Sequence, residues 1–217
     1  MSIDQPPLII DLDNSLITSD TLIDSISKCL SANIFNIFKL FLWILQGRSV
    51  LKYNLSKNFI INAKEIYYRS EILALIENSK KKGKKIFLCS GANENQVKII
   101  YEDLGLFDDF YGSSLENNLT GKKKKKFLEE KFGFKKFEYL GDSAVDIPVW
   151  ESCKKAYLIN VSNAVKHKLI KNNIEYKEIK KRSSFFDQLK VYIKAIRIYQ
   201  WVKNLLIFLP IFLSQEF

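Results

Sequence analysis

The chain has 217 residues, of which 47% are hydrophobic, so it can bury one good-sized core with a small second unit and is not intrinsically disordered. Its net charge of +10 is compatible with nucleic acid, an anionic membrane surface or anionic small substrates as partners. Much of the excess is lysine in short runs, without the arginine, glycine and aromatic residues usual in RNA-binding proteins, so we expect no nucleic-acid partner.

The cysteines and the N-terminal sequence bear on the cellular compartment. The three cysteines, Cys29, Cys89 and Cys153, are far apart and odd in number, which argues against a disulfide framework and indicates a reducing environment. The opening "MSIDQPPLII" lacks the basic region and long apolar core of a secretory signal. We therefore expect a cytoplasmic domain.

The first predicted element is a buried parallel strand over residues 8–13, "LIIDLD". Residues two apart in a strand point to the same side, so Asp11 and Asp13 can face one site at the strand end. The repulsion between the two carboxylates is relieved by a divalent cation, and Mg²⁺ prefers oxygen ligands of this kind. Because Asp also caps turns and helices, the pair becomes informative only together with further residues.

The segment 16–68 interrupts the regular order of elements. It contains "NIFNIFKLFLWILQG", in which apolar residues cover most of a helix and Lys39 is the only charge. Because this helix is too short to span a bilayer, the segment is predicted to be a helical cap over the site, with the apolar helix buried. An interfacial helix at a membrane is the alternative interpretation.

Strands and helices alternate from residue 69 onward, which predicts an α/β fold with a doubly wound parallel sheet and helices on both faces. Glycines close the predicted helices. The expected helices cover residues 70–83, 93–105 and 122–133, and the expected strands cover 85–90, 137–142 and 156–161. Right-handed crossovers would gather the carboxyl ends of these strands at one edge, where ligands usually bind.

Each later strand end supplies a residue that phosphoryl chemistry needs. Ser90 follows the second strand and could donate to a phosphoryl oxygen, while Asp142 and Asp146 follow a later strand and could complete a metal site with Asp11. Between them, "GKKKKKFL" offers a lysine for the charge that develops on a transferring phosphoryl group. Four weak signals in this order indicate a phosphoryl-transfer site.

At this point the chain resembles the haloacid dehalogenase superfamily of phosphohydrolases. Its four motifs are matched by "DLDNSL", "LCSG", a lysine in "GKKKKKFL", and "GDSAVD". The resemblance implies a Rossmann-like core over residues 1–15 and 69–180, with a small helical cap over 16–68 inserted after the first motif. Relatives that cleave carbon–halogen bonds lack the second acid, so Asp13 favours phosphoryl transfer.

The resemblance also implies a role for each acidic residue. Asp11 would be the nucleophile that forms an aspartyl-phosphate, and Asp13 would protonate the leaving group and then activate water. A Mg²⁺ ion would be held by Asp11, Asp13 through its backbone carbonyl, and Asp142, with Asp146 supporting this shell.

Ser90, Gly91 and one lysine would bind the phosphoryl group. Five successive lysines at 122–126 leave the choice open, because helical geometry turns only some of them inward. The register of the subfamily most similar in pattern, Gly followed by two variable residues and Lys, selects Lys124, and the others are taken as a solvated face.

The tail over residues 184–217 begins as an amphipathic basic helix and turns strongly apolar. Its uninterrupted apolar run, "LLIFLPIFL", is shorter than the ~20 residues of a transmembrane helix. The stretch "QWVKN" at 200–204 resembles the start of the first transmembrane helix of UbiA-type polyprenyl transferases, in the branch of decaprenyl-phosphate phosphoribosyltransferases. This resemblance implies a truncated transmembrane segment, whereas an amphipathic helix docked on the core or on a membrane is the alternative.

Together these features predict a Mg²⁺-dependent phosphatase that is cytoplasmic and associated with the inner face of the cytoplasmic membrane. Its substrate would be a small phosphorylated metabolite or a lipid-linked one, such as a polyprenyl-linked phosphoribose, and a membrane surface or a membrane transferase domain would be its partner. The alternative is a catalytically inactive domain that regulates or scaffolds a UbiA-type transferase. All four motif carboxylates are present, which favours the enzyme.

Overall fold

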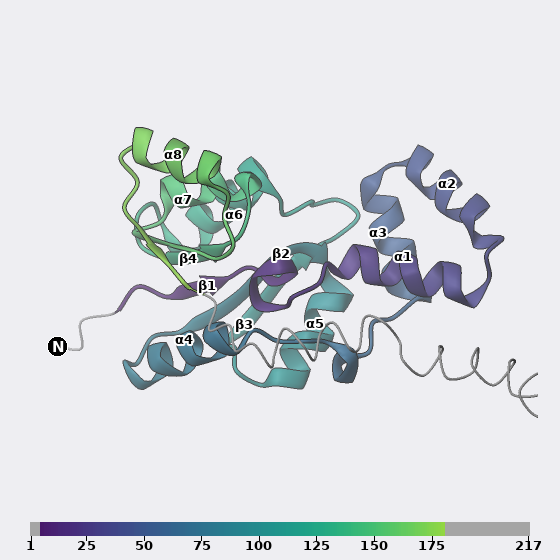
Figure 1. Ribbon diagram of the computed structural model, residues 1–217, viewed down its shortest axis with the longest axis horizontal. Coiled ribbons are helices and arrows are strands. Elements are labelled where there is room, and N and C mark those ends of the chain that lie inside the picture. Colours follow the sequence, from purple (N-terminus) through teal and green to yellow (C-terminus); the bar gives the residue numbers. More distant parts are fainter. Residues whose placement is uncertain (1–4, 181–217) are drawn as a thin grey trace, which may run out of the picture. The chain divides into compact units, whose positions relative to one another are not determined.

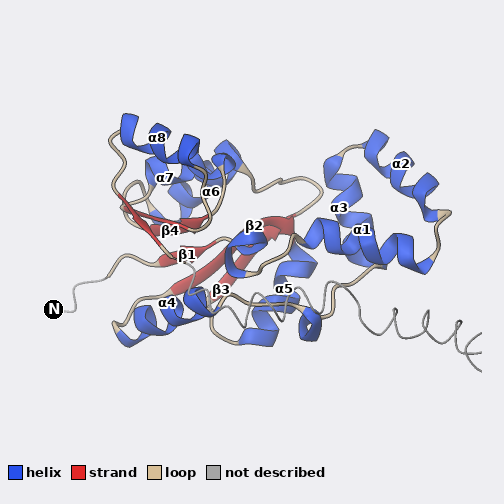
Figure 2. Ribbon diagram, in the orientation of Figure 1, coloured by secondary structure: helices blue, strands red, loops and turns tan. Residues whose placement is uncertain are grey.

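Six parallel strands form one sheet in the order β3-β2-β1-β4-β5-β6 (Figures 1 and 2) in the computed structural model, which describes residues 5–180. The strands are β1 (Leu8–Ile10), β2 (Ile86–Asn93), β3 (Asp109–Ser113), β4 (Glu138–Gly141), β5 (Lys155–Leu158) and β6 (Tyr176–Glu178). The predicted α/β fold with a parallel sheet and helices on both faces is confirmed.

Helices cover both faces of this sheet (Figure 1). One face carries α4 (Ser70–Lys81) and α5 (Glu94–Leu104), and the other carries α6 (Gly121–Phe132), α7 (Ile147–Ser152) and α8 (Asn163–Lys171). In β1, Leu8 and Ile10 belong to the core on the α4–α5 side, and Ile9 belongs to the core on the other side. All three side chains are fully buried, which is why this strand is continuously apolar rather than alternating.

The strand boundaries differ from the prediction at the site. The strand expected over 8–13 ends at Ile10, and an irregular helical turn, Leu12–Leu16, follows it. Asn14 adopts a left-handed conformation in this turn, with φ of 54°, which Asn tolerates better than most residues. Strands β3 and β6 were not predicted, because both lie at edges of the sheet and lack a buried apolar run.

Three helices form a separate layer beyond the carboxyl ends of the strands (Figure 1). They are α1 (Thr21–Ala32), α2 (Asn36–Gln46) and α3 (Arg48–Asn58), which share a small core of Cys29, Leu40, Leu51 and Leu55. An isolated antiparallel bridge joins Ile17 to Tyr68 where the chain leaves and re-enters the sheet layer. We infer that this bridge is the neck of the cap, between a core of residues 1–15 and 69–180 and a cap of 16–68.

The apolar helix α2 is not buried, contrary to the expectation for "NIFNIFKLFLWILQG". In this helix only Asn36 and Leu40 are buried, whereas large side chains such as Phe38 and Leu45 are each 68% exposed. The small core of the cap uses one narrow side of α2, namely Leu40 and the partly buried Trp43, so most of the other apolar side chains of this helix stay more than half exposed. Among those residues no helix is both long enough and apolar enough to cross a membrane.

The predictions made for 184–217, including the amphipathic helix and the "QWVKN" stretch, lie outside the described residues.

A close approach between β3 and the start of α5 requires a glycine. A Cβ atom on Gly112 would lie 2.8 Å from the backbone nitrogen of Glu94, and backbone atoms cannot give way cheaply. We expect Gly112→Ala to destabilise the protein by ~1–3 kcal/mol, the usual cost of overpacking, and to lower the melting temperature by about 5 °C. Thermal unfolding followed by circular dichroism measures this. Glu116→Ala, at an exposed position after β3, is the control, with an expected effect within ~0.5 kcal/mol, and equal melting temperatures for the two variants would contradict the assigned contact.

Candidate active site

The carboxyl ends of three neighbouring strands meet at one point of the sheet edge. Strand β1 pairs with β2 on one side and with β4 on the other, with Ile10 opposite both Leu88 and Leu140. Asp11 directly follows β1 and Asp142 directly follows β4. Residues that are far apart in the sequence therefore share one site, as expected for a parallel sheet.

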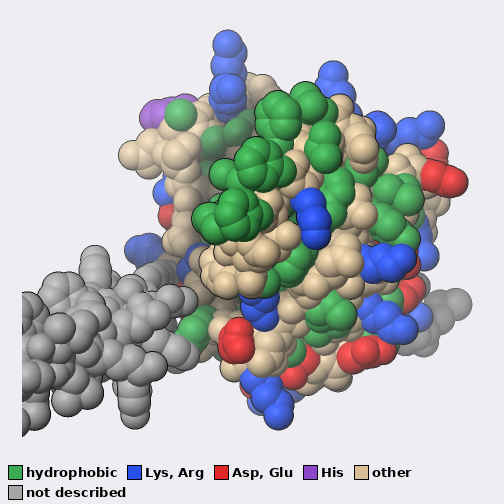
Figure 3. All heavy atoms as spheres, turned by 90° about the vertical axis from the view of Figure 1, so that its right-hand side faces the viewer, with side chains coloured by type: hydrophobic (Ala, Val, Ile, Leu, Met, Phe, Trp, Pro, Cys, Tyr) green, Lys and Arg blue, Asp and Glu red, His purple; other side chains and the backbone are tan. Residues whose placement is uncertain are grey.

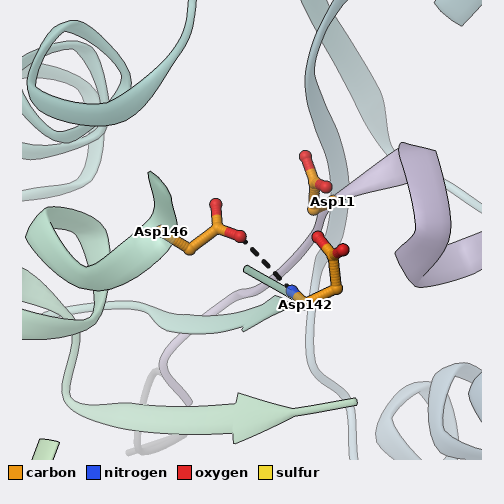
Figure 4. A group of neighbouring side chains, drawn as sticks. All are labelled: Asp11, Asp142 and Asp146. Carbon is orange, nitrogen blue, oxygen red and sulfur yellow. Dashed lines mark hydrogen bonds between the residues drawn. The ribbon is translucent and has the colours of Figure 1, made fainter. Parts of the chain in front are cut away.

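Three carboxylates gather there: those of Asp11, Asp142 and Asp146 (Figure 4). Each offers an oxygen, and these oxygens all lie within 4.8 Å of one another. Asp11 is 6% exposed and Asp146 is 4% exposed, so little water is available to separate the charges. Such a cluster of like charges requires compensation from donors or cations.

Lys124 supplies part of this compensation. Its Nζ lies 2.6 Å from Oδ1 of Asp11 and 3.9 Å from Oδ1 of Asp146, and its side chain is 4% exposed. Lys122, Lys123 and Lys126 are exposed and Lys125 is half-buried, so Lys124 is the member of the lysine run that faces the site. The register that selected Lys124 thus coincides with the inward side of α6.

Asp146 is held by donors on both of its oxygens. Its Oδ1 accepts from the hydroxyl of Tyr139 at 2.8 Å, and that hydroxyl in turn accepts from Lys124 at 2.9 Å. Its Oδ2 accepts from the backbone N–H groups of Asp142 and Ser143 at 3.3 and 3.2 Å (Figure 4). Asp146 therefore fixes the loop that carries Asp142.

Asp13 and Ser90 lie in the same cavity as the carboxylate cluster. Asp13 sits in the irregular turn after β1, and its Oδ1 accepts from the backbone N–H of Thr21 at 2.8 Å. Asp11 and Asp13 face one cavity because of this turn. They do not lie in a strand, so the alternation of side chains along a strand is not the reason. The buried hydroxyl of Ser90 accepts from the backbone N–H of Ala92 at 3.0 Å, which leaves its own proton for another acceptor.

Burial shifts the pKa values of the carboxyl groups upward. It raises the pKa of Asp11 to about 8, because desolvation outweighs the opposing effect of Lys124 and nearby Asp146 adds to it. Burial and then Asp146 raise the pKa of Asp142 to about 6. Burial alone would lower the pKa of Lys124, but Asp11 and Asp146 reverse the shift, so its ammonium group stays charged.

Burial also raises the pKa of Asp13 to about 6. The hydrogen bond from the backbone N–H of Thr21 opposes this shift. A carboxyl group in this range can both give and take a proton near neutral pH.

The cavity, of about 240 Å³, also contains residues that the sequence analysis missed. Arg48 and Lys52 of α3 line it, and Nζ of Lys52 donates to the carbonyl oxygen of Gly91 at 2.6 Å. The only available signal was their i, i+4 spacing, which puts both on one side of a polar helix. Thr21 lines it too, and its Oγ1 is buried without a hydrogen-bond partner among the described residues.

The carboxylate cluster fits a small divalent cation. Oxygen ligands surround Mg²⁺ at ~2.1 Å, so two ligands of one ion stand at most ~4.2 Å apart, and the oxygens of Asp11 and Asp142 lie within 4.8 Å of each other. Burial and then the charge of Asp146 raise the pKa of Asp142, and a cation at this point would oppose both effects.

Solved structures with the same architecture share the arrangement of strands and helices. A hydrolase of the haloacid dehalogenase (HAD) family from Salmonella enterica serovar Typhi superposes with a TM-score of 0.57 at 14% identity, over 82% of this chain and 69% of that one. A phosphoserine phosphatase in apo form gives 0.56 at 18% identity, over 86% and 98% of the two chains. A phospho-aspartyl intermediate analogue of phosphoserine phosphatase gives 0.55 at 14%, over 87% and 99%.

The chain has the HAD-like fold. No family model matches its sequence. The uncharacterized protein y4nM of Sinorhizobium fredii (strain NBRC 101917 / NGR234) is 32% identical over 209 residues, which are 96% of this chain and 40% of that protein. The HAD-like chain thus spans about 40% of the length of this curated relative.

Magnesium and pH should act on stability through Asp142. Without metal, the pKa of Asp142 is about 6 in the folded state and 3.8 in the unfolded state. The folded state therefore binds the proton more tightly, and the stability that this group contributes falls as the pH rises from about 3.8 to about 6. Protons therefore compete with Mg²⁺ below pH 6. We expect saturating MgCl₂ to raise the melting temperature by about 5 °C at neutral pH and clearly less at pH 5.

Thermal unfolding of the wild type, Asp142→Asn and the exposed control Glu116→Gln measures this effect. The shift with MgCl₂ should disappear in Asp142→Asn and persist in Glu116→Gln. A shift of equal size in both variants would place the metal elsewhere.

Proposed function

We propose that the protein is a Mg²⁺-dependent phosphohydrolase that transfers a phosphoryl group to Asp11. The observation that carries this proposal is the 2.6 Å contact between Lys124 and Asp11 beside the carboxylates of Asp142 and Asp146. A buried ammonium group against one carboxylate of an acidic cluster suits the stabilisation of a transferring phosphoryl group. The HAD-like fold supports the same chemistry.

In the first step, a carboxylate oxygen of Asp11 attacks phosphorus, and the bond from phosphorus to the leaving oxygen breaks. Lys124, which holds Oδ1 of Asp11, fixes the orientation of the attacking group. Ser15 helps to do so, because its hydroxyl donates to Oδ2 of Asp11 at 3.3 Å. Asp13 donates its proton to the leaving oxygen, which departs as an alcohol.

In the second step, Asp13 takes a proton from water as the water oxygen attacks the aspartyl-phosphate. The phosphorus–oxygen bond to Asp11 breaks, inorganic phosphate leaves, and both acids return to their starting states. The raised pKa of Asp13, about 6, supports both roles, because its two protonation states are close in free energy near neutral pH.

The phosphoryl oxygens would be bound by groups that line the cavity beside Asp11. The Ser90 hydroxyl has a proton to donate, the backbone of Gly91 lies next to it, and the Lys124 ammonium group brings positive charge. These groups would stabilise the charge that gathers on the phosphoryl oxygens during transfer.

A Mg²⁺ ion held by Asp11, the backbone carbonyl of Asp13, and Asp142 would supply charge neutralisation between these carboxylates and the phosphoryl oxygens. Both oxygens of Asp146 already accept hydrogen bonds, so this residue suits a supporting role rather than that of a ligand.

The substrate class follows from the cap. Arg48 and Lys52 bring two positive charges of the cap into the cavity, beside Asp20 and the carboxylates of the core, and they would pair with a second anionic group of a phosphomonoester. The hydroxyl of Thr21, which has no hydrogen-bond partner within residues 5–180, offers one further polar contact. A polyprenyl-linked phosphoribose has two phosphate groups and remains our candidate for a lipid-linked substrate, whereas soluble sugar bisphosphates share its chemistry.

The nucleophile is tested by substitution of Asp11. We expect Asp11→Asn to lower kcat for p-nitrophenyl phosphate by at least ~10³-fold in the presence of Mg²⁺, because the amide cannot form the acyl phosphate. Asp103→Asn, at an exposed position, is the control and should retain activity. An inactive scaffold domain would show no Mg²⁺-dependent hydrolysis in any of the three proteins, whereas equal activity in all three would remove Asp11 from the mechanism.

The second anionic group is tested by removing the charge of Lys52. We expect Lys52→Met to raise KM for a sugar bisphosphate about tenfold, with a much smaller change for p-nitrophenyl phosphate, because one charge-assisted contact is worth ~1.5 kcal/mol or more. Lys57→Met on the same helix is the matched control, because Lys57 is exposed and lies outside the cavity. If Lys52→Met changes KM equally for both substrates, Lys52 does not bind a second anionic group of the substrate.

A further inference from the structure

The outer side of the cap carries large apolar side chains that no described residue covers. In Figure 3, the view toward the side of Figure 1 that carries α2, hydrophobic side chains form a band. The α2 patch, as we call it, consists of side chains that are 52–71% exposed, namely Ile34, Phe35, Ile37, Phe38, Phe41, Leu42, Ile44 and Leu45. Soluble monomers rarely leave so many large apolar side chains together in water, so this surface is expected to have a partner.

The patch residues do not belong to the small core of the cap. Leu40 of α2 packs with Cys29, Leu51 and Leu55 of the neighbouring helices, and Trp43 is partly buried against them. The residues of the patch point away from this small core and add nothing to it.

Charge distinguishes among the possible partners. Residues 33–58 include four basic residues, Lys39, Arg48, Lys52 and Lys57, and no Asp or Glu. Basic side chains lie within and beside the apolar band, and most of the acidic ones visible in the same view lie in its lower part (Figure 3). An apolar helix with a basic border is complementary to a surface that is apolar beneath and anionic above, which describes a bilayer of anionic phospholipids.

The length of α2 fits a helix that lies in the plane of the membrane. Its 11 residues extend ~16 Å, about half the thickness of the hydrocarbon layer, so it cannot span a bilayer but can bury its apolar side at the headgroup boundary. Lys39, the single charge within the helix, can extend its ammonium group to the headgroups from such a position.

We propose that the α2 patch docks the cap on the surface of an anionic phospholipid bilayer. The proposal rests on exposure and charge alone and is independent of the proposed phosphatase activity. Helix α3 packs on α2 through Leu51 and lines the cavity with Arg48 and Lys52, so docking would hold the cavity one helix away from the lipid surface. A second copy of this chain, or residues 182–217 of the same chain, would be the rival occupants of the patch.

Vesicle flotation of the full 217-residue chain tests the proposal. The vesicles contain phosphatidylcholine and phosphatidylglycerol at a ratio of 3:1, with pure phosphatidylcholine for comparison. We expect the wild type to float with the anionic vesicles, to bind the neutral ones at least fivefold more weakly, and to lose binding at high salt.

The paired variant Phe38→Ser/Phe41→Ser removes two rings of the patch and should lower the partition coefficient at least tenfold. Its matched control, Phe134→Ser/Ile170→Ser, removes two equally exposed side chains from the core domain and should change it less than twofold. Circular dichroism verifies that both variants fold. Should the first pair fail to fold, Lys39→Glu against Lys168→Glu makes the same comparison through charge.

Three results would overturn the proposal. If the wild type does not float with anionic vesicles, the patch does not bind lipid. Equal binding by the patch variant and its control places the lipid contact elsewhere, including residues 182–217. A wild-type dimer that the patch variant converts to a monomer, as seen by analytical ultracentrifugation, without a change in vesicle binding assigns the patch to a second copy of the chain.

Discussion

The buried contact between Lys124 and Asp11 is the constraint on which the site depends. Three carboxylates meet at one edge of the sheet, and those of Asp11 and Asp146 have little access to water, so the repulsion among them is strong. One ammonium group offsets part of this charge, and Tyr139 passes a hydrogen bond from Lys124 to Asp146. The charge that remains on the carboxylates is negative. The site is therefore suited to bind a cation that neutralises it.

This arrangement explains why the helix before β4 must begin where it does. Lys124 reaches Asp11 because α6 starts at Gly121, so that the fourth residue of the helix turns toward the sheet while its neighbours face solvent. A shift of one residue would rotate this side chain by ~100° and remove it from the site. The neighbouring Gly141 has a similar role in β4, because a Cβ there would lie 2.7 Å from Oδ2 of Asp146.

Four strands of the sheet, three helices of the core and the residues at the strand ends could be predicted from the sequence, because buried parallel strands are continuous apolar runs and their ends are marked by polar residues. Edge strands β3 and β6 could not, since half-exposed strands lack that pattern. The cap was the harder part. Its apolar helix predicted burial, but a core of four residues has room for only one side of α2, and periodicity cannot reveal how much surface is available to cover a helix.

The cap thus has two unlike surfaces, and the order of its helices decides which faces the site. The polar helix α3 contacts the core, where Lys52 binds the carbonyl of Gly91, while on α1 the hydroxyl of Ser25 accepts from Gln96 at 2.5 Å. These contacts are polar and short, so they specify orientation more than they add stability. Had α2 faced the core instead, its apolar side chains would have been covered, but the cavity would have lost both basic residues. Exposure of α2 therefore accompanies the placement of Arg48 and Lys52 in the cavity, and that exposure is what makes the outer surface of the cap suitable for a second role.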